Sequence, residues 1–259
     1  MTEIIDWRKV RNNLIEVLRM RTDPVGVRLL KGSELAVPSD VKPLSTTAVC
    51  QMIAISRYGR ENGIVMTSVE GLKCLWASAC LGMTRSPDRL VNGDLNRAFV
   101  KDEPAGKELQ DKIFAIGNDS KIYGGIMTAP LDLFPGEPDV IVMYLTAGQA
   151  LKVLLGLSYE KGEVVENPIT GQAAVCQSIA RAMTTDRMIL EIPCFGDRTY
   201  GLVQDDELVI VIPASKVGQV LQGMKGTNAF APYPFRPFLM WPALFPPEFE
   251  PTRAELERE

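Results

Sequence analysis

The residues of this chain best suited to chemistry are its five cysteines, Cys50, Cys74, Cys80, Cys176 and Cys194. Two of them stand in nearly identical sequences, AVCQMIA from Ala48 and AVCQSIA from Ala174, which indicates an internal repeat. The polar residues before each copy predict that both cysteines lie in the first turn of a helix. Backbone N–H groups at a helix N-terminus stabilise a thiolate. The repeat therefore predicts two cysteines in equivalent positions.

The second pair of cysteines, Cys74 and Cys194, follows two segments that are typical of strands, residues 63–69 and 188–192. If the two copies of the repeat are related by a pseudo-twofold axis, four thiols converge on one centre between them. Cys80 is the substitute for Cys74 in this arrangement. Four thiolates form the ligand set of an iron–sulfur cluster, and structural zinc is the alternative metal.

The absence of histidine from the chain narrows the chemistry further. It excludes Ser-His-Asp and Cys-His nucleophile pairs, and it leaves thiolates and oxygens as the only side-chain metal ligands of use. The cysteine spacing lacks the close Cys-x-x-Cys pairs of most zinc sites and the compact runs of ferredoxins, so the ligands would come from distant loops. Two other interpretations stay open: the cysteines are buried core side chains, or two of them form a redox pair.

A polar cluster after Cys194 is a second candidate site. The guanidinium of Arg198 is a planar fork suited to carboxylate or phosphate, so with Asp197 it predicts a site for a small anionic molecule. The alternative is plain turn chemistry before the next strand, which is favoured for Asp205 and Asp206. A glycine pair earlier in the chain allows close backbone approach, either to a ligand or in a tight turn. The candidate ligand-binding residues are Asp197, Arg198, Tyr200, Gly124 and Gly125.

The elements that must position these residues follow from hydrophobic periodicity. It predicts an amphipathic helix from Trp7 to Leu18 and a strand from Val25 to Leu30. It also predicts strands at 139–143 and 207–212, each followed by a helical pattern, at 148–155 and 214–221. We therefore expect a mixed α/β (α+β) fold in which residues 1–230 form one globular domain. Its two pseudo-equivalent duplicated halves, about 24–157 and 158–230, would share a mixed sheet.

Residues 231–259 differ from the rest of the chain because prolines alternate with aromatic residues. Such a segment forms neither a regular helix nor an inner strand. Exposed aromatic rings are costly in water, so we expect a C-terminal arm that packs on its own domain or on a second subunit of a homo-oligomer.

The composition excludes several classes of protein. The chain has 259 residues, 46% of them hydrophobic, and a net charge of −4, which gives no electrostatic basis for nucleic-acid binding. The most apolar long stretch, 140–157, contains Gln149 and Lys152 and does not predict a membrane span. The acidic start of the chain is unlike a secretory signal, so we expect a cytoplasmic protein. No Walker A or Gly-x-Gly-x-x-Gly sequence indicates a nucleotide site.

Several of these motifs together resemble one prokaryotic family, domain of unknown function 169, over Pro24 to Met224. The motifs are the Cys-Gln pairs at 50 and 176, the 74–82 segment, Pro138-Asp-Val-Ile-Val142, Cys194-x-Gly-Asp-Arg198 and Asp205-Asp-Glu-Leu208. The resemblance implies no known catalytic residues. The family occurs in archaea and anaerobic bacteria, which is consistent with an oxygen-sensitive centre.

The sequence thus favours a protein that binds an iron–sulfur or other thiolate-ligated metal centre between its two halves. Redox or small-anion chemistry would take place next to that centre. Two alternatives come from other functional classes. In the first, the protein is a metal-free module that binds a small ligand. In the second, it is an interaction subunit that docks through residues 231–259.

Overall fold

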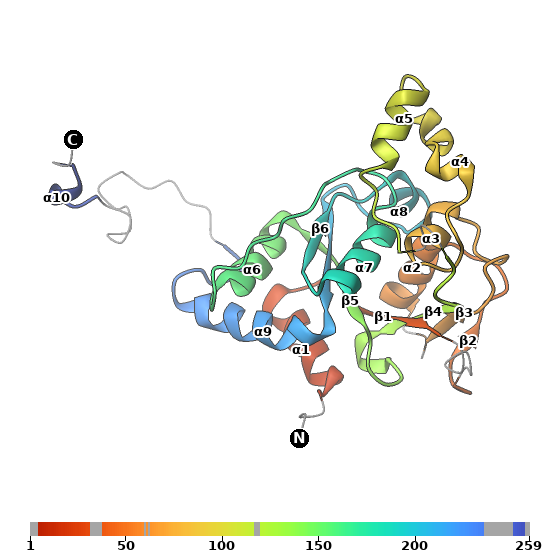
Figure 1. Ribbon diagram of the computed structural model, residues 1–259. Helices are drawn as coiled ribbons and strands as arrows, with labels where there is room; N and C mark the ends of the chain where they lie inside the picture. The colour runs from red at the N-terminus through yellow and green to blue at the C-terminus, as the bar shows by residue number, and fades with distance from the viewer. Residues whose placement is uncertain are drawn as a thin grey trace.

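The computed structural model describes residues 5–31, 38–59, 61, 63–116, 120–235 and 251–256. Its centre is a seven-stranded mixed sheet with the strand order β2-β3-β4-β1-β5-β7-β6 (Figure 1). Neighbouring strands run antiparallel except for the parallel pair β2–β3. The strands are β1 (Val25–Leu30), β2 (Lys42–Pro43), β3 (Ile64–Met66), β4 (Gly125–Pro130), β5 (Val140–Thr146), β6 (Ile189–Glu191) and β7 (Glu207–Pro213).

Helices cover both faces of this sheet over two large cores (Figure 1), and a smaller third cluster gathers around Val65, Met127 and Phe134. Along β5, Val140 and Val142 face the first core, whereas Ile141 and Met143 face the second, as the alternation of a strand requires. The first core lies under α2 (Val49–Gly59), α3 (Leu75–Cys80) and α7 (Ala174–Thr185); the second lies under α1 (Trp7–Leu18), α6 (Ala147–Ser158) and α9 (Val217–Gly226). The remaining helices are α4 (Asp88–Val91), α5 (Glu103–Gln110), α8 (Phe195–Tyr200) and α10 (Arg253–Leu256).

On the second face, α6 and α9 touch backbone to backbone. A Cβ built on Gly223 would collide with the carbonyl oxygen of Gly156, and one on Gly156 would lie 2.6 Å from the carbonyl oxygen of Val220. Both glycines are therefore required by the close approach of the two helices. The start of α6 is fixed by a capping box in which Thr146 and Gln149 exchange side-chain and backbone hydrogen bonds.

A buried ion pair fastens α2 to β7. Arg57 Nη2 donates to Glu207 Oε1 at 2.5 Å, and the two side chains are only 1% and 3% exposed. Arg57 Nε donates to Thr22 Oγ1 at 3.1 Å, and the guanidinium lies 4.4 Å from the ring centre of Tyr144. A carboxylate, a hydroxyl and an aromatic face thus stabilise the buried charge, although Nη1 of Arg57 has no hydrogen-bond partner in the described part of the chain.

The mixed α/β fold expected from the sequence is confirmed. The N-terminal helix, the strand from Val25 to Leu30, and the two strands that precede helices lie where periodicity predicted them. The helical pattern at 214–221 is a 3-10 turn, Ala214–Lys216, before α9 begins at Val217. The expected strand at 63–69 is confined to Ile64–Met66.

The order of elements is similar after each copy of the repeat. A helix, α2 or α7, leads to a short strand, β3 or β6, and then to a six-residue helix, α3 or α8. The next strand, β4 or β7, pairs antiparallel with that short strand, but α4, a 3-10 helix (Asp94–Ala98) and α5 intervene between α3 and β4. The strands β4 and β7 both end in a proline followed by a 3-10 turn. This order does not by itself establish a duplication, so the duplicated halves and their boundaries stay predictions.

The described start of the C-terminal arm is anchored on the second face of the sheet. Lys152 is fully buried on α6, and its Nζ donates to the carbonyl oxygen of Ala231 at 2.8 Å and to Thr227 Oγ1 at 3.0 Å. The rings of Tyr233 and Phe235 pack edge to face. Most of the arm, 236–250 and 257–259, lies outside the described residues, so its predicted packing on the domain or on a second subunit stays a prediction. In the described ranges, no helix is both long and apolar enough to cross a membrane.

Candidate functional site

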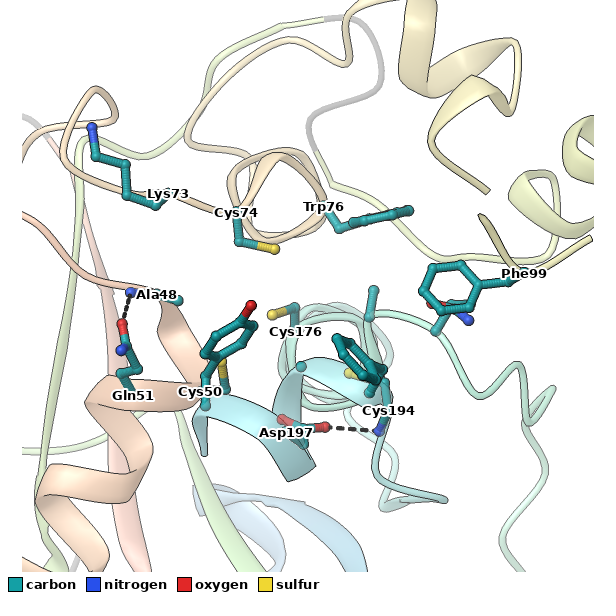
Figure 2. Close-up of a pocket in the computed structure, with 15 residues that line it drawn as sticks. Ala48, Cys50, Gln51, Lys73, Cys74, Trp76, Phe99, Cys176, Cys194 and Asp197 are labelled. Atoms are coloured by element: carbon teal, nitrogen blue, oxygen red, sulfur yellow. Dashed lines mark hydrogen bonds between the residues drawn. The ribbon is translucent and has the colours of Figure 1, made fainter. Parts of the chain in front are cut away.

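Four of the five cysteines line one cavity of about 420 Å³ beside the first core (Figure 2). They are Cys50, Cys74, Cys176 and Cys194, the four thiols that the repeat predicted to converge. All are free thiols. Cys80 is 1% exposed in the adjacent core and does not line the cavity. The fold therefore gathers these four cysteines from four separate segments of the chain.

Each of these four cysteines stands at the start of a helix. Cys50 is the second residue of α2 and Cys176 the third of α7, in the first turn as expected from the sequence. Cys74 and Cys194 are the N-cap residues of α3 and α8. Ser, Thr, Asp and Asn are the usual N-caps, because their oxygens accept N–H groups of the first turn. Two cysteines at N-cap positions thus depart from the usual choice of N-cap residue, which indicates a role for them beyond capping.

The sulfur atoms receive backbone N–H groups at several of these positions. Cys194 Sγ accepts the N–H of Asp197, and Asp197 Oδ2 accepts the N–H of Cys194 at 3.2 Å, so the two residues form a capping box. Cys74 Sγ makes no capping hydrogen bond, but the nearby N–H groups of Trp76 and Ala77 act to lower its pKa. These donors favour the thiolate form of both cysteines.

Burial outweighs these donors when the cavity holds no cation. Burial, together with the charge of Asp197, raises the pKa of Cys50 to about 12 and that of Cys194 to about 12. Burial also raises the pKa of Cys74 and of Cys176. The four thiols are thus neutral at pH 7 in the metal-free protein. A bound metal cation reverses this balance, because it deprotonates the thiols that coordinate it.

Asp197 forms the floor of the cavity and connects it to the interior. Its side chain is fully buried, and burial raises its pKa. Asp197 Oδ1 accepts a hydrogen bond from the hydroxyl of Tyr144 at 3.3 Å. The guanidinium of Arg57 lies over the ring of Tyr144 in a cation–π contact. Gly201 follows α8, where a Cβ would lie 3.2 Å from Cys50 Cβ, so a glycine here lets α8 approach α2. The site and the buried ion pair therefore share one polar network.

The rim of the cavity is aromatic. It is built by Trp76, Phe99, Phe195 and Tyr200. The ring centres of Phe99 and Phe195 lie 6.4 Å apart, and these two side chains are 47% and 60% exposed. Among the described residues that line the cavity, Lys73 is the sole cationic one and Asp197 the sole anionic one. Figure 2 shows Lys73 and Gln51 on one side, Phe99 on the other, and the cysteines between.

The other residues proposed from the sequence have different places. Tyr200 lines the cavity, but Arg198 does not. Arg198 Nη1 donates to the carbonyl oxygen of Gln204 at 2.9 Å and lies 3.3 Å from Asp205 Oδ1, so it holds the turn before β7. The N–H of Gly124 donates to the carbonyl oxygen of Leu30 at 2.8 Å. Gly125 begins β4 in the sheet, and neither glycine lines the cavity.

The sequence analysis missed Lys73, Trp76, Phe99 and Phe195 as cavity residues. Lys73 and Trp76 flank Cys74, and Phe195 follows Cys194, so proximity to the cysteines could have indicated these three. Phe99 comes from the segment between α3 and β4, which gave no signal of its own. The aromatic residues next to the cysteines in the sequence could therefore have indicated the rim of the cavity.

The donor set of the cavity suits a thiolate-bound centre, although its atoms are spread out. Over the described ranges, no group of three or more Cys, Asp or Glu is arranged as a site for a single ion. The residues able to hold a larger centre are Cys50, Cys74, Cys176 and Cys194.

Comparison with known proteins places the chain in a family. Residues 13–223 match DUF169, a family described as "Uncharacterised ArCR". The chain is also 26% identical, over 229 residues, to the uncharacterized protein MJ0308 of Methanocaldococcus jannaschii; the match covers 85% of this chain and 96% of that protein. No solved structure matches the chain. The match over residues 13–223 includes all four cavity cysteines and shows that the chain belongs to the DUF169 family.

Proposed function

We propose that the cavity binds an iron–sulfur cluster or another thiolate-ligated metal centre. Its ligands are Cys50, Cys74, Cys176 and Cys194. One observation carries the proposal: four helix starts each bring one free cysteine to the same cavity. A buried core cysteine has no need to stand at a helix start or to face a cavity.

The N-cap positions support thiolates rather than thiols. A neutral thiol accepts hydrogen bonds weakly, whereas a thiolate satisfies the N–H groups of a helix start as a charged acceptor. Cys194 already accepts one such N–H, from Asp197. Hydrogen bonds to the cysteine sulfurs also tune the reduction potential of iron–sulfur clusters. The backbone around the cavity is thus suited to stabilise a metal–thiolate centre.

The volume of the cavity is compatible with a cluster as well as with a single zinc ion. A cluster places several iron and sulfide ions between the thiolates, so its ligands stand further apart than the four sulfurs around one zinc. The cavity of about 420 Å³ leaves room for such a group.

A bound centre would supply electron transfer or Lewis-acid chemistry. The residues of the chain would have three tasks around it. The four cysteines release their protons and hold the centre. Asp197 fixes the backbone N–H of Cys194 and thereby the direction of that ligand. The rings of Phe99 and Phe195 limit the access of water at the rim. Because such centres and free thiols persist in reducing compartments, we also propose a cytoplasmic location.

The test is the metal content of the full chain purified without oxygen. We expect a broad visible absorption band, iron, and matching acid-labile sulfide. Cys50→Ser and Cys176→Ser should lose them, whereas Cys80→Ala should keep them because Cys80 does not line the cavity. Zinc without sulfide would instead identify a zinc site. A colourless, metal-free protein, also after reconstitution with iron and sulfide, would refute the proposal.

The two alternatives from the sequence have different supports. The metal-free ligand-binding module is favoured by the aromatic rim and by Lys73 at the mouth of the cavity. The interaction subunit depends on residues 231–259, most of which lie outside the described residues. A chain that ends at residue 230 tests it: loss of an oligomer with an intact fold would support docking through the arm, and an unchanged assembly state would exclude it.

A further inference from the structure

We propose that the mouth of the cavity binds a small molecule with a flat, apolar body and one anionic group, such as an aromatic carboxylate. This inference rests on the proposed function only in that both use the same cavity. The metal centre would occupy the cysteine-lined part, and the small molecule would occupy the rim above it. The anion-binding residue is Lys73 instead of Arg198, which the sequence favoured.

The anionic group belongs on the side of Lys73 and Gln51. The Nζ of Lys73 donates to the carbonyl oxygen of Glu70 at 3.0 Å and, in the described part of the chain, has no carboxylate partner. Gln51 uses its Oε1 to accept the N–H of Ala48 at 2.9 Å, so its amide Nε2 stays available as a donor. An ammonium and an amide N–H on one side of a cavity form a recognition site for a carboxylate.

The apolar body belongs on the opposite side, between the rings of the rim. Phe99 and Phe195 lie at 54° to each other and leave about half of each side chain exposed. The indole N–H of Trp76 lies 3.4 Å from Gln110 Oε1, which fixes that ring. Exposed aromatic surface gains free energy when another ring covers it, by stacking and by loss of contact with water. A flat, apolar molecule therefore fits this side.

The size and charge of the cavity agree with such a ligand. The whole cavity of about 420 Å³ lies toward the small end of the range for ligand cavities, so a ligand that shares it with a metal centre must be small and extend over the rim. A cationic ligand would meet Lys73 at the mouth. The one anionic side chain among the described lining residues, Asp197, lies at the floor of the cavity, so the anionic group of the ligand belongs at the mouth beside Lys73. The arrangement thus selects a ligand with negative charge at one end only.

The experiment compares charged probes with uncharged ones. Benzoate, phenylacetate and indole-3-acetate are titrated into the full chain by calorimetry, each beside its uncharged amide, on metal-free and on metal-loaded protein. We expect at least one acid to bind more tightly than its amide. Lys73→Gln should weaken that acid about tenfold and leave the amide unchanged. Phe99→Ala should weaken both, whereas Lys101→Gln, an exposed lysine outside the cavity, should change neither.

The outcomes separate this inference from the proposed metal centre. If no acid binds at millimolar concentration, if acids and amides bind equally, or if Lys101→Gln weakens binding as much as Lys73→Gln, the inference is overturned. If the acid binds as expected but no metal is taken up, the inference stands and the metal proposal falls. If metal is bound and no acid is, only the inference falls.

Discussion

Cys74 and Cys194 occupy the same position in two different helices: each is the N-cap of a six-residue helix, and both line the same cavity. The two helices, α3 and α8, follow the strands β3 and β6, which lie toward opposite ends of the sheet order. Helices this short have little stability of their own, so their ends depend on caps and on tertiary contacts. The cysteines thus combine a local structural task with their place in the cavity.

This double task makes serine and alanine variants differ at Cys194. Serine is a preferred N-cap and alanine is a poor one, so Cys194→Ser should be more stable than Cys194→Ala by about 1 kcal/mol. Both variants should lose the metal centre, since neither side chain is a thiolate. Urea unfolding of the metal-free proteins measures the difference. Equal stability of the two variants would contradict the capping role.

The raised thiol pKa values predict slow alkylation of the metal-free protein. With a pKa of about 12, Cys50 and Cys194 are thiolate in about one molecule in ten thousand at pH 8, far less than a free cysteine. Their reaction with iodoacetamide should therefore be slow at pH 8 and should still accelerate between pH 9 and 10. Mass spectrometry follows each cysteine, with urea-unfolded chain as the reference. Rates at pH 8 equal to those of the unfolded chain would contradict these pKa values.

The buried ion pair predicts a large loss of stability on removal of one partner. Arg57→Met leaves Glu207 buried without its cation and should lower the free energy of unfolding by about 3–5 kcal/mol. The double variant Arg57→Met, Glu207→Leu should recover much of that loss, because it removes both charges. Arg21→Gln, which breaks the exposed pair with Asp206, is the control and should have little effect. A single variant as stable as this control would contradict the prediction.

The contact of α6 with α9 predicts opposite effects for two glycines of one helix. Gly223→Ala would place a methyl group against the carbonyl oxygen of Gly156 and should cost about 1–3 kcal/mol or more. Gly218→Ala meets nothing within 4 Å and should be neutral or stabilising by up to about 1 kcal/mol. Thermal unfolding of the two variants provides the measurement, and a Gly223→Ala protein as stable as the parent would refute the close contact.

Glu191 predicts a pH dependence of stability. Burial raises the pKa of this carboxyl group, which is 1% exposed in β6. The folded protein therefore holds this proton more tightly than the unfolded chain. The corresponding stability is complete below the unfolded pKa of about 4.3 and is lost as pH rises through the folded pKa.

Replacement of Glu191 by glutamine tests this sign. The stability of Glu191→Gln relative to the parent should increase as pH rises from 4 toward neutrality, as measured by urea unfolding at several pH values. The change of this stability difference with pH is the readout, because the loss of one hydrogen-bond acceptor in the variant shifts its free energy of unfolding by the same amount at every pH. Glu166→Gln, an exposed carboxylate, is the control and should show no such slope. A decreasing difference would contradict the raised pKa.

Much of the scaffold of the site could be predicted from the sequence. The repeated AVCQ segments indicated two helix starts, and α2 and α7 begin there. Long periodic segments such as α1 and α6 were also found, because their apolar residues recur over several turns. The hypothesis that four cysteines converge came from the repeat, which holds Cys50 and Cys176, and from the strand patterns before Cys74 and Cys194; these four cysteines do line one cavity.

The details of the cavity could not be predicted in the same way. The helices α3, α4 and α8 have four to six residues, too few for a periodic pattern. Arg198 has the chemistry of an anion-binding residue, but its guanidinium donates to the carbonyl oxygen of Gln204 in a turn. The sequence does not show whether such a guanidinium will bind a ligand or a backbone carbonyl, because the tertiary structure decides which partner it meets. Lys73 is an ordinary surface lysine in the sequence and becomes distinctive only where it meets the cavity.

The division of the protein into two cores by one sheet has a further consequence. The cavity belongs to the side of α2 and α7, whereas the glycine contact of α6 with α9 and the anchor of Lys152 belong to the other side. Distant sites that share no partners contribute additively to stability. The side of α6 and α9 can therefore be engineered for robustness while the cysteine cavity keeps its properties. The protein could thus be made more stable without any change to the residues that line the cavity.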